Sequence, residues 1–251
     1  MINILMHGCN GKMGQVITHL AAEDDNVTIA AGVDAYDGIA NNYPVFSTLN
    51  ECNVDTDVII DFSNALAVDG LLDYAVASKT PVVLCTTGLS EEQLDKVEAA
   101  SKHVAVLRSA NMSIGINVIL KLLKEAVSHF APEGFDVEIV EKHHNQKLDA
   151  PSGTAIALAD AMNEEMNGMY EYVYDRSQVR EKRGKNELGI SAIRGGNIVG
   201  EHDVIFAGTD EVITISHSAH SKAIFAKGAI AAAKYLAGRT PGLYDMSDVM
   251  A

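Results

Sequence analysis

Residues 2–14, Ile2-Asn-Ile-Leu-Met-His-Gly8-Cys-Asn-Gly11-Lys-Met-Gly14, decide the fold of the N-terminal half. A short apolar run leads directly into a glycine-rich turn, and a helical pattern starts at Met13. Glycines in such a turn allow the main chain to approach a pyrophosphate, and the helix start offers unpaired N–H groups. The sequence therefore predicts a strand, loop and helix that bind a dinucleotide.

The glycine spacing alone is not specific, because GxxGxxG departs from GxGxxG and ordinary strand-to-helix turns also contain glycine. Asp34 lies 20 residues after Gly14, at the end of a second β-branched run. A carboxylate there can accept hydrogen bonds from an adenosine ribose. In the alternative interpretation the glycines only shape a turn and Asp34 caps a loop. The coincidence of strand, loop, helix and acid favours the dinucleotide site.

Short β-branched runs alternate with helical stretches up to about Leu107, as expected for a parallel sheet covered by helices on both faces. The predicted strands cover residues 2–6, 27–33, 58–62, 82–85 and 104–107. The predicted helices cover residues 13–22, 65–78 and 90–101, and Ser90 with Gln93 forms a capping box at the start of the last one. We therefore predict an α/β fold whose N-terminal half is a doubly wound, Rossmann-type parallel sheet.

The pattern changes after Asn111, where strands begin to alternate between apolar and polar residues. Alternation of this kind indicates a sheet with one solvent-facing side. The expected helices cover residues 116–130 and 154–166, and the expected strands cover 135–141, 190–194, 198–206 and 212–217. The sequence thus predicts a second, smaller α+β domain over about residues 113–221. An alanine-rich helix at 223–236 follows it and ends before Gly238.

The 251-residue chain is acidic, with a formal net charge of −15 and a sequence pI near 4.9. Nucleic-acid binders need a clustered cationic surface, so we expect no nucleic-acid partner, and anionic membrane surfaces are disfavoured for the same reason. No apolar run approaches the roughly 18 residues of a membrane-spanning helix, and we expect no export leader. Cys9, Cys52 and Cys85 are widely spaced and odd in number. This disfavours disulfides and predicts a cytoplasmic protein.

A second unusual stretch runs Glu141-Lys-His143-His144-Asn-Gln-Lys147-Leu-Asp-Ala-Pro-Ser152-Gly153-Thr154, between a predicted strand and a predicted helix. Its two lysines and two imidazoles concentrate positive charge in an acidic protein and could attract an anion. Its last three residues fit a helix entry, where N–H groups and hydroxyls can bind a carboxylate. The stretch is therefore a candidate anion-binding site.

Other interpretations of this stretch remain open. His143 and His144 could bind a metal, although neighbours on an extended segment point to opposite sides and no cysteine lies nearby. The residues could also be solvated loop positions, with Ser152 acting only as a helix cap. Their clustering between a strand and a helix favours a functional site.

Motifs along the whole chain resemble those of the 4-hydroxy-tetrahydrodipicolinate reductase family, long called dihydrodipicolinate reductases. The resemblance rests on Gly8-x-x-Gly-Lys-Met-Gly14, Asp61-Phe-Ser63, Thr86-Thr-Gly88, Ser109-Ala-Asn-Met-Ser-Ile-Gly-Ile-Asn117, His143-His-x-x-Lys-x-Asp-Ala-Pro-Ser-Gly-Thr-Ala155, Arg194-Gly195 with Val199-Gly-Glu-His202, and Phe225-Ala-x-Gly-Ala229. The block from His143 to Thr154 is highly specific, whereas many oxidoreductases share the glycine loop.

The resemblance implies reduction of a cyclic, dianionic dicarboxylate by hydride from NADH or NADPH, with loss of water, in the diaminopimelate route to lysine. It implies that His143 is the proton donor, that Lys147 is its partner, and that the substrate carboxylates are bound by His144, Ser152, Gly153 and Thr154. The glycine loop and the resemblance together give the expected cofactor-binding residues: Gly8, Asn10, Gly11, Lys12, Met13, Gly14, Asp34, Phe62, Ser63, Thr86, Thr87, Gly88, Ala110, Asn111 and Met112.

The resemblance also bears on domains and assembly. It implies a homotetramer joined through the sheet of the second domain, and a final helix that returns to the first domain. The expected domains are therefore residues 1–112 with 223–251 for the dinucleotide, and residues 113–222 for substrate binding and oligomerisation.

Cofactor choice follows from the residues around Asp34. Binders of NADP usually supply a cation for the 2′-phosphate, but Ala35 and Tyr36 follow Asp34 and leave Lys12 as the nearby base. We predict that NADH is used at least as well as NADPH.

The chain departs from the family pattern at three positions. Lys222 stands where an arginine is common. A planar guanidinium that can form paired hydrogen bonds is thus replaced by a compact ammonium charge. Cys85 replaces the more usual glycine before Thr-Thr-Gly, and Met112 the usual phenylalanine.

Two other functions compete with this interpretation. One is a different two-domain dehydrogenase that acts on an amino acid or a polyol. The other is a non-catalytic NAD sensor, which would need the glycine loop but no convergent His and Lys. The block from His143 to Thr154 distinguishes the predicted reductase from both.

Overall fold

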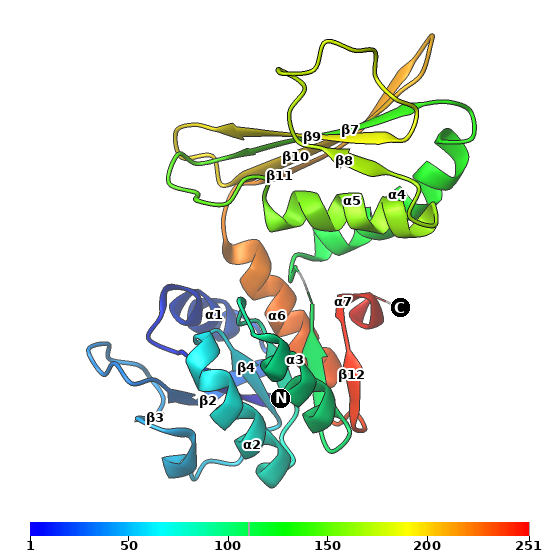
Figure 1. The fold of residues 1–251 in the computed structure, drawn as a ribbon. Coiled ribbons are helices and arrows are strands. Elements are labelled where there is room, and N and C mark those ends of the chain that lie inside the picture. Colours follow the sequence, from blue (N-terminus) through cyan, green and yellow to red (C-terminus); the bar gives the residue numbers. More distant parts are fainter. Residues whose placement is uncertain (110, 251) are drawn as a thin grey trace. The chain divides into compact units, whose positions relative to one another are not determined.

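The computed structural model describes residues 1–109 and 111–250 (Figure 1). The chain forms two compact units, one of Met1–Ile114 with the segment from Ala223 onward, and one of Gly115–Lys222. Ala110, one of the residues expected to contact the cofactor, lies outside the described residues.

The first unit is built around a seven-stranded parallel sheet in the order β12-β6-β5-β4-β1-β2-β3. Its strands are β1 (Ile2–His7), β2 (Val27–Val33), β3 (Val45–Phe46), β4 (Val58–Asp61), β5 (Val82–Leu84), β6 (Ala105–Arg108) and β12 (Gly242–Tyr244). Its helices are α1 (Lys12–Ala22), α2 (Val68–Ser78), α3 (Glu91–Ser101), α6 (Ala223–Leu236) and α7 (Met246–Val249), with 3-10 turns η1 (Leu49–Glu51) and η2 (Ala65–Ala67). The predicted doubly wound parallel sheet is confirmed.

Helices cover both faces of this sheet (Figure 1). Ile4 and Met6 of β1 point into a core that also contains Ile17 of α1 and alanines of α6. Leu5, between them, points into a second core with Leu71 of α2. All residues of β4 are buried, as expected for a strand that is covered on both sides.

Helix α6 packs closely on the segment that follows β6. A Cβ atom added to Gly228 would lie 1.6 Å from the carbonyl oxygen of Met112, a distance that no side chain tolerates. Glycine therefore lets the two backbones meet. This contact gives a physical reason for the glycine in the Phe225–Ala229 motif.

Several short elements differ from the sequence prediction. The single helix expected over residues 65–78 is divided into η2 and α2, because Asn64 accepts a hydrogen bond from Leu66 N and caps a tight first turn. The short strands β3 and β12 and the helix α7 were not predicted, since two to four residues carry no periodic pattern.

The second unit is a five-stranded mixed sheet in the order β11-β10-β7-β9-β8. Its strands are β7 (Asp136–His143), β8 (Glu171–Val173), β9 (Glu187–Arg194), β10 (Gly200–Ala207) and β11 (Val212–Ala219), and its helices are α4 (Ile114–Phe130) and α5 (Gly153–Glu165). The pairs β7–β9 and β8–β9 are parallel, whereas β10 is antiparallel to both β7 and β11. The short β8 was not predicted.

Helices α4 and α5 lie on one side of this sheet (Figure 1). Alternate residues of β7 and β10, such as Val137, Ile139, Val204 and Phe206, are buried in a core shared with both helices. The opposite face carries ion pairs, including Lys142 with Glu201 and Asp203 at 3.1 Å each. The predicted sheet with one wet face is confirmed.

None of the helices within residues 1–109 and 111–250 is both long and apolar enough to cross a membrane.

Candidate active site

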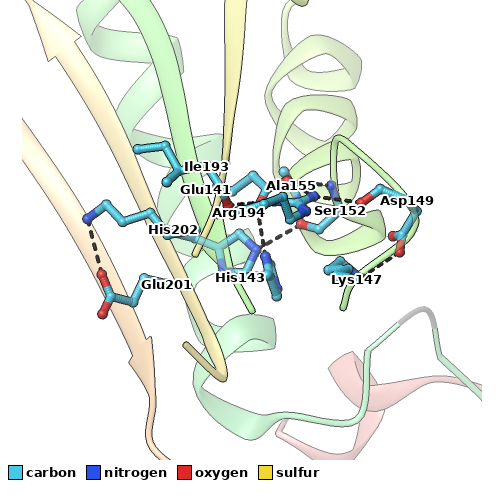
Figure 2. Close-up of polar contacts among 11 residues, drawn as sticks. Glu141, His143, Lys147, Asp149, Ser152, Ala155, Ile193, Arg194, Glu201 and His202 are labelled. Atoms are coloured by element: carbon cyan, nitrogen blue, oxygen red, sulfur yellow. Dashed lines mark hydrogen bonds and ion pairs between the residues drawn. The ribbon is translucent and has the colours of Figure 1, made fainter. Parts of the chain in front are cut away.

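A fully buried carboxylate, that of Glu141, lies at the centre of the polar residues in the second unit (Figure 2). His143 Nδ1 lies 2.6 Å from its Oε2 atom, and the backbone N–H of Ser152 donates to its Oε1 atom at 2.9 Å. Arg194 donates through Nη1 to Oε2 and through Nη2 to Oε1, each at 2.7 Å. The carboxylate thus joins β7, β9 and the start of α5.

Strand register explains how these residues meet. Glu141 and His143 share the helix-facing side of β7, because alternate residues of a strand point to the same face. Arg194 at the end of β9 pairs with His143, and His202 of β10 pairs with Glu141. Ser152 is the N-cap of α5, and its Oγ atom accepts a hydrogen bond from Ala155 N at 3.1 Å.

The charge state of Glu141 follows from its partners. Burial acts to raise the pKa of Glu141, but the hydrogen bonds from Arg194, His143 and Ser152 outweigh it and lower the pKa. The carboxylate is therefore ionised at neutral pH and only accepts hydrogen bonds. It follows that Nδ1 of His143 carries a proton, and that Nε2 is the ring atom left for other chemistry. Glycine at position 200 keeps a side chain away from Nε2, since a Cβ atom there would lie 3.1 Å from it.

The turn after β7 holds two further predicted residues, His144 and Lys147. Lys147 N donates to His144 O at 3.1 Å, and Lys147 Nζ lies 2.9 Å from Asp149 Oδ1. This ion pair lowers the pKa of Asp149. Within the part of the chain that the structure describes, neither side chain bonds to Glu141, His143 or Ser152.

Gly153 is exposed at the first residue of α5, and Thr154 is half-buried in its first turn. A Cβ atom added to Gly153 would meet nothing within 4 Å, so the space in front of the helix start is open.

His202 belongs to this cluster although sequence reasoning gave it no role. The residue is 5% exposed, its Nε2 atom lies 3.0 Å from Ser152 Oγ, and its ring centroid is 5.2 Å from that of His143. Burial, with the nearby His143 as a second cause, lowers the pKa of His202 to about 4. His202 is therefore neutral at physiological pH. The sequence alone likewise indicates no role for Glu141 and Arg194, because these residues come together only through the register of paired strands.

The low pKa of His202 makes stability depend on pH. Between pH 6.5 and 4 the unfolded chain binds a proton at this ring that the folded chain does not, so stability falls as the pH falls. His202 contributes at most about 1.4 kcal/mol per pH unit to this fall. We expect His202→Asn to show a shallower decline of the free energy of unfolding from pH 6.5 to pH 4.5, measured by urea titration of the full chain. If the free energy of unfolding declined equally steeply with pH in wild type and His202→Asn, the lowered pKa of His202 would be contradicted, whatever the absolute stabilities.

In the first unit, the predicted cofactor residues gather at the carboxyl ends of the strands. The order in which the chain adds strands reverses between β1 and β4, and parallel sheets bind ligands outside such a reversal. Gly8 follows β1 with a φ of +81°, and a Cβ atom on it would lie 2.6 Å from Phe62 O, just after β4. A Cβ atom on Gly14 would lie 2.3 Å from Gly8 O. The tight turn therefore requires both glycines.

The start of α1 fits a phosphate group. Its N-cap, Gly11, has no side chain to accept from the first-turn N–H groups. Lys12 is exposed and Met13 half-buried in the same turn. The loop thus has the shape and the donors that a dinucleotide pyrophosphate needs.

Asp34, which is predicted to accept hydrogen bonds from the ribose, also holds this loop through hydrogen bonds from its backbone. Its Oδ2 atom accepts a hydrogen bond from Asn10 N at 2.9 Å, and its Oδ1 atom accepts one from Tyr36 N at 3.0 Å. The side-chain amide of Asn10 also donates to Tyr36 O. Each carboxylate oxygen retains a second lone pair, so a ribose hydroxyl can still donate to Asp34.

A second buried carboxylate, that of Asp61, ties three strand ends together. His7 Nδ1 lies 2.7 Å from Oδ1, Ser63 Oγ donates to Oδ1 at 2.6 Å, and Thr86 Oγ1 donates to Oδ2 at 2.6 Å. The neighbouring Cys85 has its thiol pKa raised by burial and by Asp61, so the thiol stays protonated. Asp61 and His7 were given no role from the sequence.

The remaining predicted cofactor residues follow β5 and β6. Thr87 and Gly88 are exposed, and Gly88 has a φ of +75°. Asn111 Oδ1 accepts a hydrogen bond from Ser113 N at 2.8 Å, and Met112 is buried in the core beside α6.

Comparison with known proteins decides the family. The family model for the N-terminus of dihydrodipicolinate reductase matches residues 2–112, and the model for its C-terminus matches residues 115–250. The chain belongs to the dihydrodipicolinate reductase family. It is therefore an oxidoreductase that uses a nicotinamide cofactor, and the predicted family and enzyme class are confirmed.

Individual relatives agree with this membership in the dihydrodipicolinate reductase family. The 4-hydroxy-tetrahydrodipicolinate reductase of Caldanaerobacter subterraneus subsp. tengcongensis is 55% identical over 250 residues, which cover 100% of this chain and 98% of the relative. The enzyme of the same name from Clostridium novyi is 48% identical with the same coverage. A dipicolinate-bound dihydrodipicolinate reductase from Paenisporosarcina sp. TG-14 matches with a TM-score of 0.84 at 23% identity, with both chains fully covered. This last likeness shows the fold.

Proposed function

We propose that this chain reduces 4-hydroxy-tetrahydrodipicolinate to tetrahydrodipicolinate, with hydride from NADH or NADPH and a proton from His143, in the diaminopimelate route to lysine. The names of the relatives support the substrate. The observation that carries the residue roles is that one ionised carboxylate, Glu141, binds both the ring of His143 and the start of α5. A sensor without catalysis would have no use for such an arrangement.

The second unit supplies the groups that bind a dianion and move a proton. Lys147 offers a compact charge for one carboxylate of the substrate. Gly153 and Thr154, with the hydroxyl of Ser152, offer the other carboxylate the N–H groups and partial positive charge of a helix start. His144 lies in the same turn as Lys147 and adds a further donor. Loss of the substrate hydroxyl together with a hydrogen from the neighbouring ring carbon releases water and leaves a carbon–carbon double bond. His143 then donates the proton on Nε2 to one carbon of that bond as hydride reaches the other carbon.

The first unit binds the cofactor, and the nicotinamide supplies the hydride when bound. Gly8, Gly11 and Gly14, with Asn10, Lys12 and Met13, form the turn that holds the pyrophosphate. Asp34 accepts from the adenosine ribose. We expect Phe62 and Ser63, Thr86 to Gly88, and Asn111 with Met112 to lie beside the nicotinamide.

A coupled assay tests the activity directly. A synthase condenses pyruvate with aspartate semialdehyde, this chain is added, and the absorbance of NADH is followed. We expect the absorbance to fall only when all components are present. Constant absorbance with both NADH and NADPH would reject the reductase and favour a different dehydrogenase or a sensor.

Lys147 provides a sharper test of the substrate site. We expect Lys147→Ala to lower kcat by well over tenfold while NADH affinity stays near normal, because a charge that holds and orients the dianion is lost. Steady-state kinetics and a direct NADH titration measure the two effects. Lys124→Ala, which removes a lysine paired with Glu164 on the exposed surface of the helices, is the control. Equal turnover in Lys147→Ala and wild type would remove Lys147 from the mechanism.

We also expect NADH to serve at least as well as NADPH. Lys12, at the start of α1, is the base of the glycine loop, Ala35 and Tyr36 after Asp34 supply no cation, and Asp34 would repel a 2′-phosphate. Comparing kcat/KM for the two cofactors decides this. A preference for NADPH of about tenfold or more, equivalent to about 1.4 kcal/mol, would contradict it.

We infer that the enzyme is a cytoplasmic homotetramer joined through the wet face of the second sheet. Ile193 of β9 and Val212 of β11, which are 47% and 62% exposed, place apolar side chains on that face. The three cysteines are free, as a reducing compartment requires. Light scattering after gel filtration measures the assembly, and a monomeric mass would reject the tetramer.

A further inference from the structure

We propose that Glu141 is a positioning residue that fixes the tautomer of His143 and locks that ring to the start of α5. The inference rests on the proposed function, because it concerns a residue that acts through the proton donor and through the helix that binds a substrate carboxylate. Glu141 is 0% exposed and therefore does not itself face a ligand.

Every partner of this carboxylate is a hydrogen-bond donor. Oε2 accepts from His143 Nδ1 and from one Arg194 nitrogen, and Oε1 accepts from Ser152 N and from the other Arg194 nitrogen. Both oxygens thus receive two hydrogen bonds, and neither faces an acceptor. The neutral ring of His143 must then keep its proton on Nδ1 and present a lone pair at Nε2. After the ring takes up a proton, Nε2 is the atom that can give it to a substrate.

Arg194 compensates the buried negative charge of Glu141 and extends the hydrogen-bond network to the loop before α5. Its fork spans both oxygens of Glu141, a geometry that lysine cannot reproduce. Its Nη2 atom also donates to Asp149 O at 2.6 Å, so the loop that leads into α5 is held by the same guanidinium (Figure 2). His143, the loop before α5 and the start of α5 are therefore all held by the Glu141–Arg194 pair.

An amide cannot replace this carboxylate. In Glu141→Gln, one oxygen becomes an NH₂ group that faces two donors, whichever way the amide is turned. If the NH₂ group faces His143, the ring must move its proton to Nε2; if it faces Ser152, the helix start loses its acceptor. In serine protease triads, the same change of an orienting carboxylate to an amide lowers kcat by about 10⁴-fold through the wrong tautomer.

The tautomer of His143 can be measured without any substrate. Nitrogen-15 NMR of the histidine-labelled full chain, at a pH where the ring is neutral, distinguishes a proton on Nδ1 from one on Nε2. The signals of His143 are identified by their loss in His143→Gln. We expect Nδ1–H in the wild type and a shift toward Nε2–H in Glu141→Gln. A neutral wild-type ring with its proton on Nε2 would overturn the proposal, even if Glu141→Gln failed to fold.

Kinetics of the same variant give the second measurement. We expect Glu141→Gln to lower kcat by about 10²-fold or more, with an NADH dissociation constant within about twofold of the wild type. Glu164→Gln, which removes an exposed carboxylate of α5 paired with Lys124, should retain wild-type kcat. Wild-type kcat in Glu141→Gln would overturn the proposal.

The two proposals fail in different ways. An inactive wild-type enzyme in the coupled assay would reject the reductase while leaving the Nδ1–H tautomer in place. An active wild-type enzyme whose tautomer does not depend on Glu141 would reject the positioning role alone.

Discussion

Replacing His143 by Gln is expected to lower kcat by about 10²-fold or more, because the reaction would lose its proposed proton donor. Glutamine has a similar length and can still donate to Glu141 through its amide, so the buried carboxylate keeps a partner. The affinity for NADH should stay within about twofold, since the proposed cofactor residues belong to the first unit. Steady-state kinetics with a separate NADH titration measure both quantities.

His129→Gln is the matched control for this change. His129 ends α4 in the same unit, 71% exposed and paired with Glu125 four residues earlier. Its loss should leave kcat unchanged. Equal turnover in His143→Gln and His129→Gln would mean that another group delivers the proton.

Replacing Gly14 by Ala should abolish tight cofactor binding, with a loss of well over tenfold in affinity for both NADH and NADPH. The added Cβ atom would lie 2.3 Å from Gly8 O and 2.6 Å from Cys9 O. Backbone atoms cannot turn away as a flexible side chain can, so the loop must move out of the position that a pyrophosphate needs. Calorimetric titration with each cofactor measures the loss.

Gly70→Ala separates this local clash from the general effect of a methyl group in a helix. Gly70 lies within α2 of the same unit, and a Cβ atom there meets nothing within 4 Å. Alanine at this position should leave affinity unchanged and stabilise the helix by up to about 1 kcal/mol. Unchanged cofactor affinity in Gly14→Ala, alongside that control, would show that the loop tolerates the methyl group. It would contradict the proposal that the glycine turn binds the pyrophosphate.

The parts of the fold that the sequence predicts are those with local causes. The glycine turn after β1, the Ser90 capping box of α3 and the alternation along β7 are each contained in a few consecutive residues. The α5 helix begins at Gly153, one residue before the predicted start, because Ser152 caps it. These features depend on backbone geometry and burial periodicity, which a single segment displays.

The buried polar clusters could not be predicted in the same way. Glu141 meets Arg194 across 53 residues and His202 across the neighbouring strand, and both meetings depend on the register of paired strands. His7 and Asp61 meet across 54 residues for the same reason. The motifs around Arg194 and His202 are visible in the sequence, but nothing in a single chain states which strand each one will face.

The first unit is discontinuous in the chain, and this bears on its synthesis. Its α6 helix contributes buried alanines to the core beside α1, and β12 pairs with β6, yet both follow the 108 residues of the second unit. During translation, the core beside α1 and the edge of β6 therefore stay uncovered until the second unit has been made and α6 and β12 follow it. A nascent chain arrested near residue 222 would thus expose apolar surface to chaperones, although its glycine turn had already been made.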